Sequence, residues 1–457
     1  MNCQGKNFEL IKNKTILWLF LGATASLIII LSVILGWPLY YCLGFILISL
    51  LTYFTFTSPK ITLFSLIMIR MVLDYPSENL YFNLTKTLSI SFSQAIGMAI
   101  FLVGLAYIIK NFSSLKKLPL KIPLGVYLIF SALTAIYSID TFSTFKELLR
   151  LFDLAFLFFL SFSTVKSKAE FNSLLKIIFL SSLIPVLAGI YQYIFHIGYT
   201  DSAFAAPRIF GTLSHPNSLS LFLFAVIALL FLYYFLNKKD NFSRYAIPFL
   251  IPAYLIVLAI TYTRIAWIAI FIFLFILGAV KFKKLLIPLI MLTMAAYLLF
   301  PTIQDRVADI VSPSPDSSLL WRKILWKDVV TETFSNHKQL FGYGVNTFKI
   351  AAENKRGIKF GSLAAHNDFI RAFVEGGYVG LLVFVFYIGY ILTYFLFKYR
   401  HSQESDKKIV FLTLFALFFA MSVSGLSDNV IRNTPLQWIF WITAGASLRV
   451  FAISVKK

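Results

Sequence analysis

The chain has 457 residues, of which 59% are hydrophobic and only 13% are charged, and its mean hydropathy is +0.81. A soluble domain carries about 25% charged residues, so this composition excludes an ordinary water-soluble fold. The formal charge of +21 does not indicate nucleic-acid binding, because the lysines and arginines lie in short clusters between apolar runs and form no continuous basic face. The composition therefore predicts a protein that folds in a lipid bilayer.

Long apolar runs recur along the sequence, each close to the roughly 20 residues that a helix needs to cross the hydrocarbon. They lack the alternation of polar and apolar residues that barrel strands show, so we predict helices. The predicted fold is all-α, a polytopic transmembrane bundle of about 12 to 14 helices. The runs are 16–36, 38–57, 60–73, 89–110, 122–138, 147–165, 172–195, 217–236, 246–262, 264–280, 283–300, 376–398, 408–425 and 434–453.

Two of these runs set the uncertainty in the number of spans. The run at 60–73 is short for a full crossing. The stretch 246–280 is interrupted only at Thr263 and Arg264. The first run follows a lysine-rich start but is too long for a signal peptide and lacks a small-residue cleavage pattern. We therefore expect it to remain as the first span.

Basic residues occur at every second connection between the runs, and such residues keep short loops on the cytoplasmic side. We therefore predict a multi-pass protein of the inner (plasma) membrane with both termini in the cytoplasm. Three parts follow: 1–300 with about 11 spans, a long external or periplasmic loop at 301–375, and 376–457 with about 3 spans. The basic connections are 110–121, 166–168, 238–244, 281–284 and 398–408.

The external loop is too long for an ordinary connection, and loops of this length usually carry function. Its segment SSLLWRKILWKDVVTETF predicts an amphipathic helix that ends near Phe334 and either lies on the membrane surface or packs on its own loop. Gly342 and Gly344 of GYGVNTF indicate a turn. A further helix is predicted to start near His366 and to run into the next span.

Three polar stretches fall on the predicted external face, immediately before or between spans. Residues 207–224 contain Arg208, His215 and Asn217; residues 261–267 contain Arg264; residues 364–381 contain His366, Asn367, Asp368, Arg371 and Glu375. In a helix, Arg371 and Glu375 are four residues apart and are expected to pair. A single arginine or histidine in such a place is ordinarily an anchor at the headgroups or a solvated side chain, so it is the grouping that carries information.

Several classes of site are absent from the sequence. There is no H-E-x-x-H, no P-loop and no G-x-G-x-x-G, and Cys3 and Cys42 imply no disulfide framework. We therefore expect neither a metal nor a nucleotide cofactor. Guanidinium groups suit phosphate, and histidine suits proton transfer near neutral pH, so the arginines and His366 suggest a site that holds phosphates and deprotonates a hydroxyl.

At these residues the sequence resembles the O-antigen ligase and polymerase superfamily of bacterial envelope glycosyltransferases. The resemblance rests on R-x-F-G-T-x-x-x-P-N at 208–217, T-x-T-R at 261–264, W-R-x-x-x-W-K-D at 321–328, G-Y-G-x-N-T-F at 342–348 and H-N-D-F-I-R-x-F-V-E-G-G-x-x-G at 366–380. It is the order of these motifs, rather than any one of them, that is specific.

The resemblance implies a transferase that moves a glycan from an undecaprenyl-diphosphate carrier to a hydroxyl acceptor, without metal or nucleotide. It implies that His366 is catalytic and that Arg208 and Arg264 bind the diphosphate. Arg322 and Arg371 are further candidates for binding phosphate or sugar, with Asn217, Asn367, Gly342 and Gly344 in support.

Three alternatives stay open. A polymerase of the same superfamily differs from a ligase only in its acceptor, which is the growing glycan, and we lean toward a ligase. A secondary transporter is less favoured, because the sequence has no convincing inverted repeat. A scaffold without activity would leave the external histidine and arginines without a role.

Overall fold

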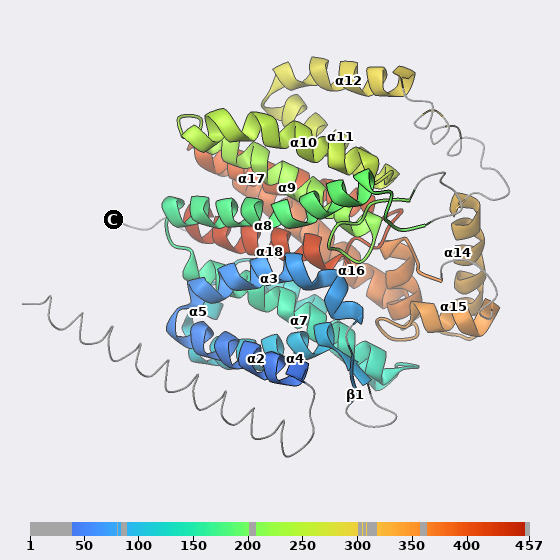
Figure 1. Ribbon diagram of the computed structural model, residues 1–457. Helices are drawn as coiled ribbons and strands as arrows, with labels where there is room; N and C mark the ends of the chain where they lie inside the picture. Colours follow the sequence, from blue (N-terminus) through green and yellow to red (C-terminus); the bar gives the residue numbers. More distant parts are fainter. Residues whose placement is uncertain are drawn as a thin grey trace, which may run out of the picture.

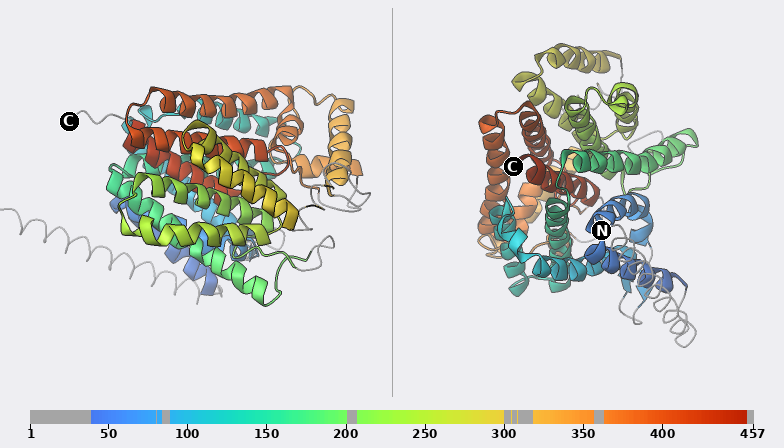
Figure 2. Two further views of the ribbon diagram at one scale, coloured as in Figure 1. Left: turned by 90° about the horizontal axis from the view of Figure 1, so that it is seen from above. Right: turned by 90° about the vertical axis from the view of Figure 1, so that its left-hand side faces the viewer.

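The structure is a computed structural model, and it describes residues 39–79, 81–83, 89–200, 207–299, 304, 308, 318–356 and 363–452. It confirms the all-α class, with one small antiparallel hairpin, β1 (Tyr81–Asn83) and β2 (Ser89–Ser91), that pairs Phe82 with Ile90. The predicted span at 16–36 lies outside the described residues. Figures 1 and 2 show most of the helices running side by side along one long axis, with α14 standing across it at one end.

The helices in chain order are α2 (Leu39–Thr57), α3 (Pro59–Asn79), α4 (Phe92–Lys110), α5 (Phe112–Lys116), α6 (Lys121–Leu133), η1 (Thr134–Ile136), α7 (Thr141–Thr164), α8 (Lys168–Ile194), α9 (Pro216–Leu236), η2 (Phe242–Ala246), α10 (Ile247–Ile260), α11 (Arg264–Val280), η3 (Lys283–Leu285), α12 (Leu286–Leu299), α14 (Ser318–Ser335), α15 (Phe348–Arg356), α16 (Asp368–His401), α17 (Ser405–Ser424), α18 (Thr434–Ser447) and η4 (Leu448–Ala452).

Within the described residues, six helical segments are long and apolar enough to cross a membrane: α4, α8, α9, the continuous segment Phe242–Ile260, α16 and α17. Shorter apolar helices lie at Ile46–Thr57, Lys121–Ile136 and Arg264–Val280. The chain is thus a multi-pass membrane protein, while the predicted 12 to 14 crossings stay a prediction. The run at 60–73, which looked too short, belongs to α3, a helix of 21 residues.

The core of the bundle is built around α9 and α18, whose residues are buried along almost their whole length. In α18, Trp441 lies edge-on to Phe158 of α7, with 5.3 Å between the ring centroids. A Cβ atom at Gly445 would lie 2.2 Å from the Ser161 Oγ, so only glycine lets α18 approach α7 this closely. The centre of the protein is therefore helix packed on helix, with aromatic rings filling the space.

The predicted basic connections gather at one end of the bundle. Lys168, at the start of α8, forms a 2.7 Å ion pair with Asp406 at the start of α17. Burial lowers the pKa of Lys281, and the neighbouring Lys408 and Lys238 act in the same direction. The basic connections, which alternate along the sequence, therefore lie together at one end of the bundle. That this end faces the cytoplasm stays a prediction.

Helices α14 and α15 lie beyond the opposite end, as Figure 1 shows. Leu325 and Val329 of α14 are fully buried in a separate small core with Phe348 and Phe373. The Trp326 indole N–H donates to the Ala365 carbonyl at 2.6 Å. Of the two placements left open by the sequence, the structure shows that this helix packs on its own segment of chain.

A helix break joins this end segment to the membrane bundle. In α16, Gly377 has φ +64°, and a Cβ there would lie 2.2 Å from the Leu340 carbonyl carbon. The Val374 and Glu375 carbonyls accept from Tyr343 and Gly344, while the Tyr378 and Val379 N–H groups donate to Gln339 and Leu340. The turn that contains Gly342 and Gly344 thus replaces two hydrogen bonds that an unbroken helix would make with itself.

Candidate active site

His366 stands directly before α16 and faces the loop between α17 and α18. The helix begins at Asp368 with Asn367 as its N-cap, so His366 is not part of the helix, and its backbone has φ +45°. Its Nδ1 lies 3.2 Å from the Oδ1 of Asp428. A positive φ is costly for a residue with a Cβ, and here it accompanies a fixed contact between the imidazole and a carboxylate.

Asp428 is 6% exposed and accepts several hydrogen bonds. The Asn217 side-chain amide donates to its Oδ2 at 2.6 Å, and the Asn429 backbone N–H donates to its Oδ1 at 2.8 Å. Burial alone would raise the pKa of Asp428, but the hydrogen bond and charge of His366, with the Asn429 N–H, hold this pKa below its usual value. Because an ionised carboxylate can only accept, the His366 Nδ1 carries a proton in this contact, and in the neutral imidazole the lone pair is then on Nε2.

Arg208 brings the first two polar stretches together. It is 8% exposed. Its Nε donates to the Thr261 carbonyl, and its Nη2 donates to the Asn217 Oδ1 and the Thr263 Oγ1, each at 3.0 Å. The same Asn217 amide therefore links Arg208 to Asp428, while His215 accepts from the Asn217 backbone N–H as the N-cap of α9.

Arg264 and Arg322 lie on the same side of this cluster. Arg264 is the first residue of α11, only one position after Thr263. Arg322 of α14 donates from Nη1 to the Ser427 carbonyl at 2.9 Å. Burial lowers the pKa of Arg322; the positive charge of Arg264 acts in the same direction, and Asp428 opposes it. Two guanidinium groups from distant helices thus lie within electrostatic range of each other, and Arg322 lies within that range of Asp428 as well.

The loop between α17 and α18 is held at nearly every residue. The Asp368 N–H donates to the Gly425 carbonyl, and the Asn367 amide to the Leu426 carbonyl at 2.8 Å. The Asn429 Oδ1 accepts from the His366 backbone N–H at 3.1 Å. Further along, the Ile431 N–H donates to the Asp368 Oδ2 at 2.9 Å. The side chain that orients the imidazole is therefore itself fixed before any substrate arrives.

Arg371 has a different environment from the one we predicted. It is 5% exposed, and its Nη2 forms a 2.9 Å ion pair with Asp368. The predicted partner Glu375 interacts with Arg371 electrostatically but forms no close ion pair with it among the described residues, and the Glu375 Oε1 accepts from the Phe348 N–H at 3.2 Å. The contacts place Arg371 behind the loop, where it fixes Asp368, and its predicted contact with phosphate or sugar stays a prediction.

The sequence analysis missed Asp428. Its only signal is a short polar triplet, Ser427 to Asn429, between two apolar runs, and nothing in that triplet indicates which distant side chain it meets. Among the described residues, no three His, Cys, Asp or Glu side chains gather as metal ligands would. The prediction that no metal is needed stays a prediction.

The cluster draws its arginines and histidine from four motifs of the sequence, and a comparison with known families covers three of them. Residues 248–385 match the O-antigen ligase family (Wzy_C). This confirms the resemblance inferred from the motifs. The O-antigen ligase region spans less than a third of the chain and contains Arg264, Arg322 and His366, whereas Arg208 and Asp428 lie outside it. No curated protein matches the chain.

The family that this region matches is one of O-antigen ligases. The site fits this class chemically. It offers a hydrogen-bonded imidazole, which suits proton transfer, next to guanidinium groups, which suit phosphate.

Proposed function

We propose that the protein is a ligase-like glycosyltransferase that moves a glycan from undecaprenyl diphosphate to a hydroxyl acceptor on the external face of the membrane, without a metal. The observation that carries this proposal is the position of Asp428. One oxygen of its carboxylate meets the His366 Nδ1, and the other is joined through Asn217 to Arg208. Proton transfer and phosphate binding are thus linked in one network.

The reaction needs one base and a site for negative charge. The His366 Nε2 takes the proton of the acceptor hydroxyl while that oxygen bonds to the anomeric carbon of the donor sugar. The bond between this carbon and the diphosphate oxygen breaks, and the diphosphate leaves with the electron pair. The ionised Asp428 stabilises the imidazolium that forms, as a carboxylate behind a histidine does in hydrolases.

The arginines are proposed to neutralise the leaving diphosphate. Arg264 of α11 and Arg322 of α14 lie within electrostatic range of each other, and Arg208 donates to Thr263, the residue before Arg264. A preorganised donor of this kind is worth about 2.7–4 kcal/mol of transition-state stabilisation, or roughly 10²–10³ in kcat. Two such groups suit the two phosphates of the carrier by their bidentate geometry.

The test is a reconstituted transfer assay with a lipid-linked glycan donor and a hydroxyl acceptor. We expect His366→Ala to lower the rate by roughly 10²–10⁴, the usual contribution of general acid–base catalysis. His337→Ala is the matched control, because His337 is an exposed histidine that follows α14. Full activity of His366→Ala would remove the catalytic assignment, and loss of activity in EDTA would remove the metal-independent mechanism.

The acceptor is tested in the same assay. Lipid-linked glycan supplied alone gives longer chains if the protein is a polymerase. A ligase leaves the glycan length unchanged until a separate hydroxyl acceptor is added. Elongation would therefore replace the ligase assignment with the polymerase of the same superfamily and leave the roles of His366 and the arginines intact.

A further inference from the structure

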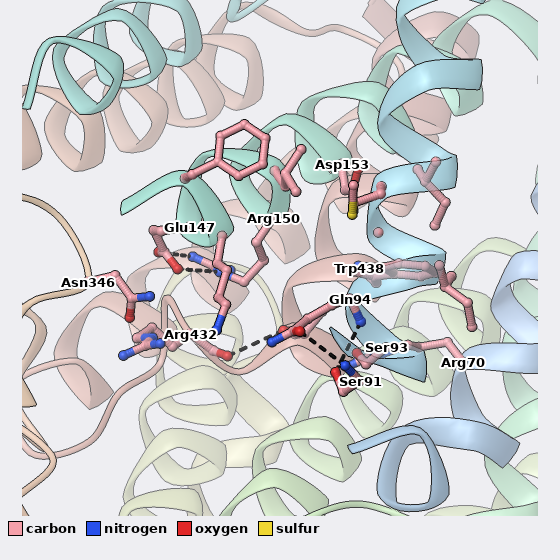
Figure 3. Close-up of a pocket in the computed structure, with 18 of the residues that line it drawn as sticks. Arg70, Ser91, Ser93, Gln94, Glu147, Arg150, Asp153, Asn346, Arg432 and Trp438 are labelled. Atoms are coloured by element: carbon pink, nitrogen blue, oxygen red, sulfur yellow. Dashed lines mark hydrogen bonds and ion pairs between the residues drawn. The ribbon is translucent and has the colours of Figure 1, made fainter. Parts of the chain in front are cut away.

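A second site lies across the α17–α18 loop from His366. Helices α3, α4, α7 and α18 enclose a cavity of about 510 Å³, shown in Figure 3. Its lining is divided between charged side chains and an apolar wall that includes Leu66 and Met98. None of the residues that line this cavity belongs to the proposed active site.

The cavity carries an excess of positive charge. Its cations are Arg70, Lys146, Arg150 and Arg432, and its carboxylates are Glu147 and Asp153. The sticks in Figure 3 show Arg150 against Glu147, which hold each other in a two-point ion pair at 2.6 and 3.0 Å. Arg70 pairs outside the lining, with Asp74.

Two cations of the lining, Arg432 and Lys146, form no ion pair within the described parts of the chain. Glu147 and Glu375 lie near enough to Arg432 to interact with its charge. Lys146 lies over the Phe142 ring at 4.2 Å. Asp153, by contrast, is 5% exposed, and its Oδ1 has no hydrogen-bond partner among the described residues. The two cations suit an anionic ligand, and the Asp153 carboxyl group is a further polar group that such a ligand can meet by a hydrogen bond.

An exposed apolar stripe leads away from the cavity along α4. It begins at Met98 in the cavity lining and continues through Leu102 and Leu105, which are 64% and 40% exposed. These residues recur at helical spacing and so lie on one face. A ligand with an anionic head and a hydrocarbon tail fits this arrangement, with its head among the cations and its tail along α4.

The cavity and the active site share one loop. Arg432 follows Asp428 by four residues, a length that spans at most about 14 Å of extended chain. The carbonyl of Ile431 accepts from the Arg150 Nη1 at 2.9 Å, while its N–H donates to the Asp368 Oδ2 on the active-site side. The loop thus lies between the two sites: His366 contacts it from one side, and the cationic cavity lies on the other.

We propose that this cavity binds the phosphate of a lipid-anchored acceptor glycan, whose hydroxyl reaches His366 over the edge of the loop. The proposal rests on the proposed function, and it names the class of acceptor. A reaction between two membrane-anchored substrates needs two anion sites, because the donor diphosphate occupies the arginines on the other side. The acceptor's phosphate can belong to a second polyprenyl-diphosphate glycan or to a phosphorylated glycolipid, since both present the same chemistry to Arg432 and Lys146.

The test measures the dependence of transfer on acceptor in phosphatidylcholine nanodiscs that hold the full chain. Three acceptors are compared: an undecaprenyl-diphosphate glycan, a phosphorylated glycolipid and an uncharged glycolipid. In the double variant Arg432→Ala/Lys146→Ala we expect the KM for the phosphate-bearing acceptor to rise roughly tenfold or more, with the KM for the donor and kcat unchanged. Lys117→Ala is the matched control, since Lys117 lines a cavity in which Lys166 and Arg449 also lie.

Each outcome decides the proposal. A rise in KM that is confined to one of the two phosphate-bearing acceptors supports the proposal and identifies the source of the phosphate. An unchanged acceptor KM, a rise for the donor instead, or an equal rise for the uncharged glycolipid overturns it. The proposed function fails separately, if His366→Ala keeps its activity. An inactive His366→Ala protein with an unaffected double variant would remove only the acceptor site.

Discussion

Replacement of Asp428 by asparagine is the sharpest perturbation of the active site, because it keeps the shape and changes only the charge and one acceptor. In the structure, both carboxylate oxygens accept: Oδ1 from His366 and Asn429, and Oδ2 from Asn217. An amide presents one oxygen and one NH2 group. If the NH2 group faces Asn217, two donors meet; if it faces His366, the imidazole must move its proton to Nε2 and can no longer act as a base.

The expected loss in Asp428→Asn follows from these two orientations. One charged hydrogen bond is worth about 1.5–3 kcal/mol, which is roughly 10- to 150-fold in rate. Complete loss of the base would cost roughly 10²–10⁴. We therefore expect kcat/KM to fall by at least about tenfold and the fall to appear mainly in kcat, because the arginines proposed to bind the donor are untouched. Asp328→Asn is the matched control, since Asp328 of α14 forms an ion pair with Arg356 of α15.

A second substitution separates loss of hydrogen bonding from loss of fold. In the double variant Asn217→Asp/Asp428→Asn, the amide introduced at position 428 donates to the carboxylate introduced at position 217 and keeps its oxygen toward His366. The carboxylate at position 217 still accepts from Arg208. We expect this pair to recover part of the activity that Asp428→Asn loses, measured as kcat/KM in the same transfer assay. Full activity of Asp428→Asn would refute the assignment of Asp428, and absence of any recovery in the pair would refute the orientation argument.

Two further predictions concern the arginines and the helix break. Arg264→Ala and Arg322→Ala should each lower kcat by roughly 10²–10³ in the transfer assay, and a rate within about twofold of the parent would exclude either from binding the diphosphate. Gly377→Ala should lower thermal stability, because φ +64° disfavours a residue with a Cβ by about 1–2 kcal/mol and the new atom meets Leu340. Gly389→Ala, on the same helix with no atom within 4 Å of the added Cβ, should not, and equal loss in both would contradict the close packing at Gly377.

Most of the membrane helices could be predicted from the sequence, because a helix that crosses the hydrocarbon needs a continuous apolar run of roughly 20 residues. The predicted run from 264 to 280 is the helix α11 in the structure. The basic connections lie at one end of the bundle, because alternate connections of a helical bundle fall on the same side. The helix break at Gly377 was not predicted. Two adjacent glycines inside an apolar run also fit an unbroken span, and the replacement hydrogen bonds come from the distant segment 339–344.

Only some residues of the candidate site could be predicted from the sequence. His366, Arg264 and Arg208 could be selected from local motifs, since each stands as a polar residue at the edge of an apolar run. Asp428 could not, because its importance lies in contacts with Asn217 and His366, which are far away along the chain. Spacing on a helix led us to expect Glu375 as the partner of Arg371, but the close ion pair is with Asp368, three residues before Arg371.

The balance of charge around Asp428 connects the stability of the site to its proposed work. Arg322 lies within electrostatic range of both the ionised Asp428 and Arg264, in a partly desolvated space where like charges repel more strongly than in water. Burial lowers the pKa of Arg322, with Arg264 acting in the same direction, so bringing these two cations together costs folding free energy. A diphosphate between the arginines would relieve the repulsion, and this is the physical reason to expect an anion with more than one charge there.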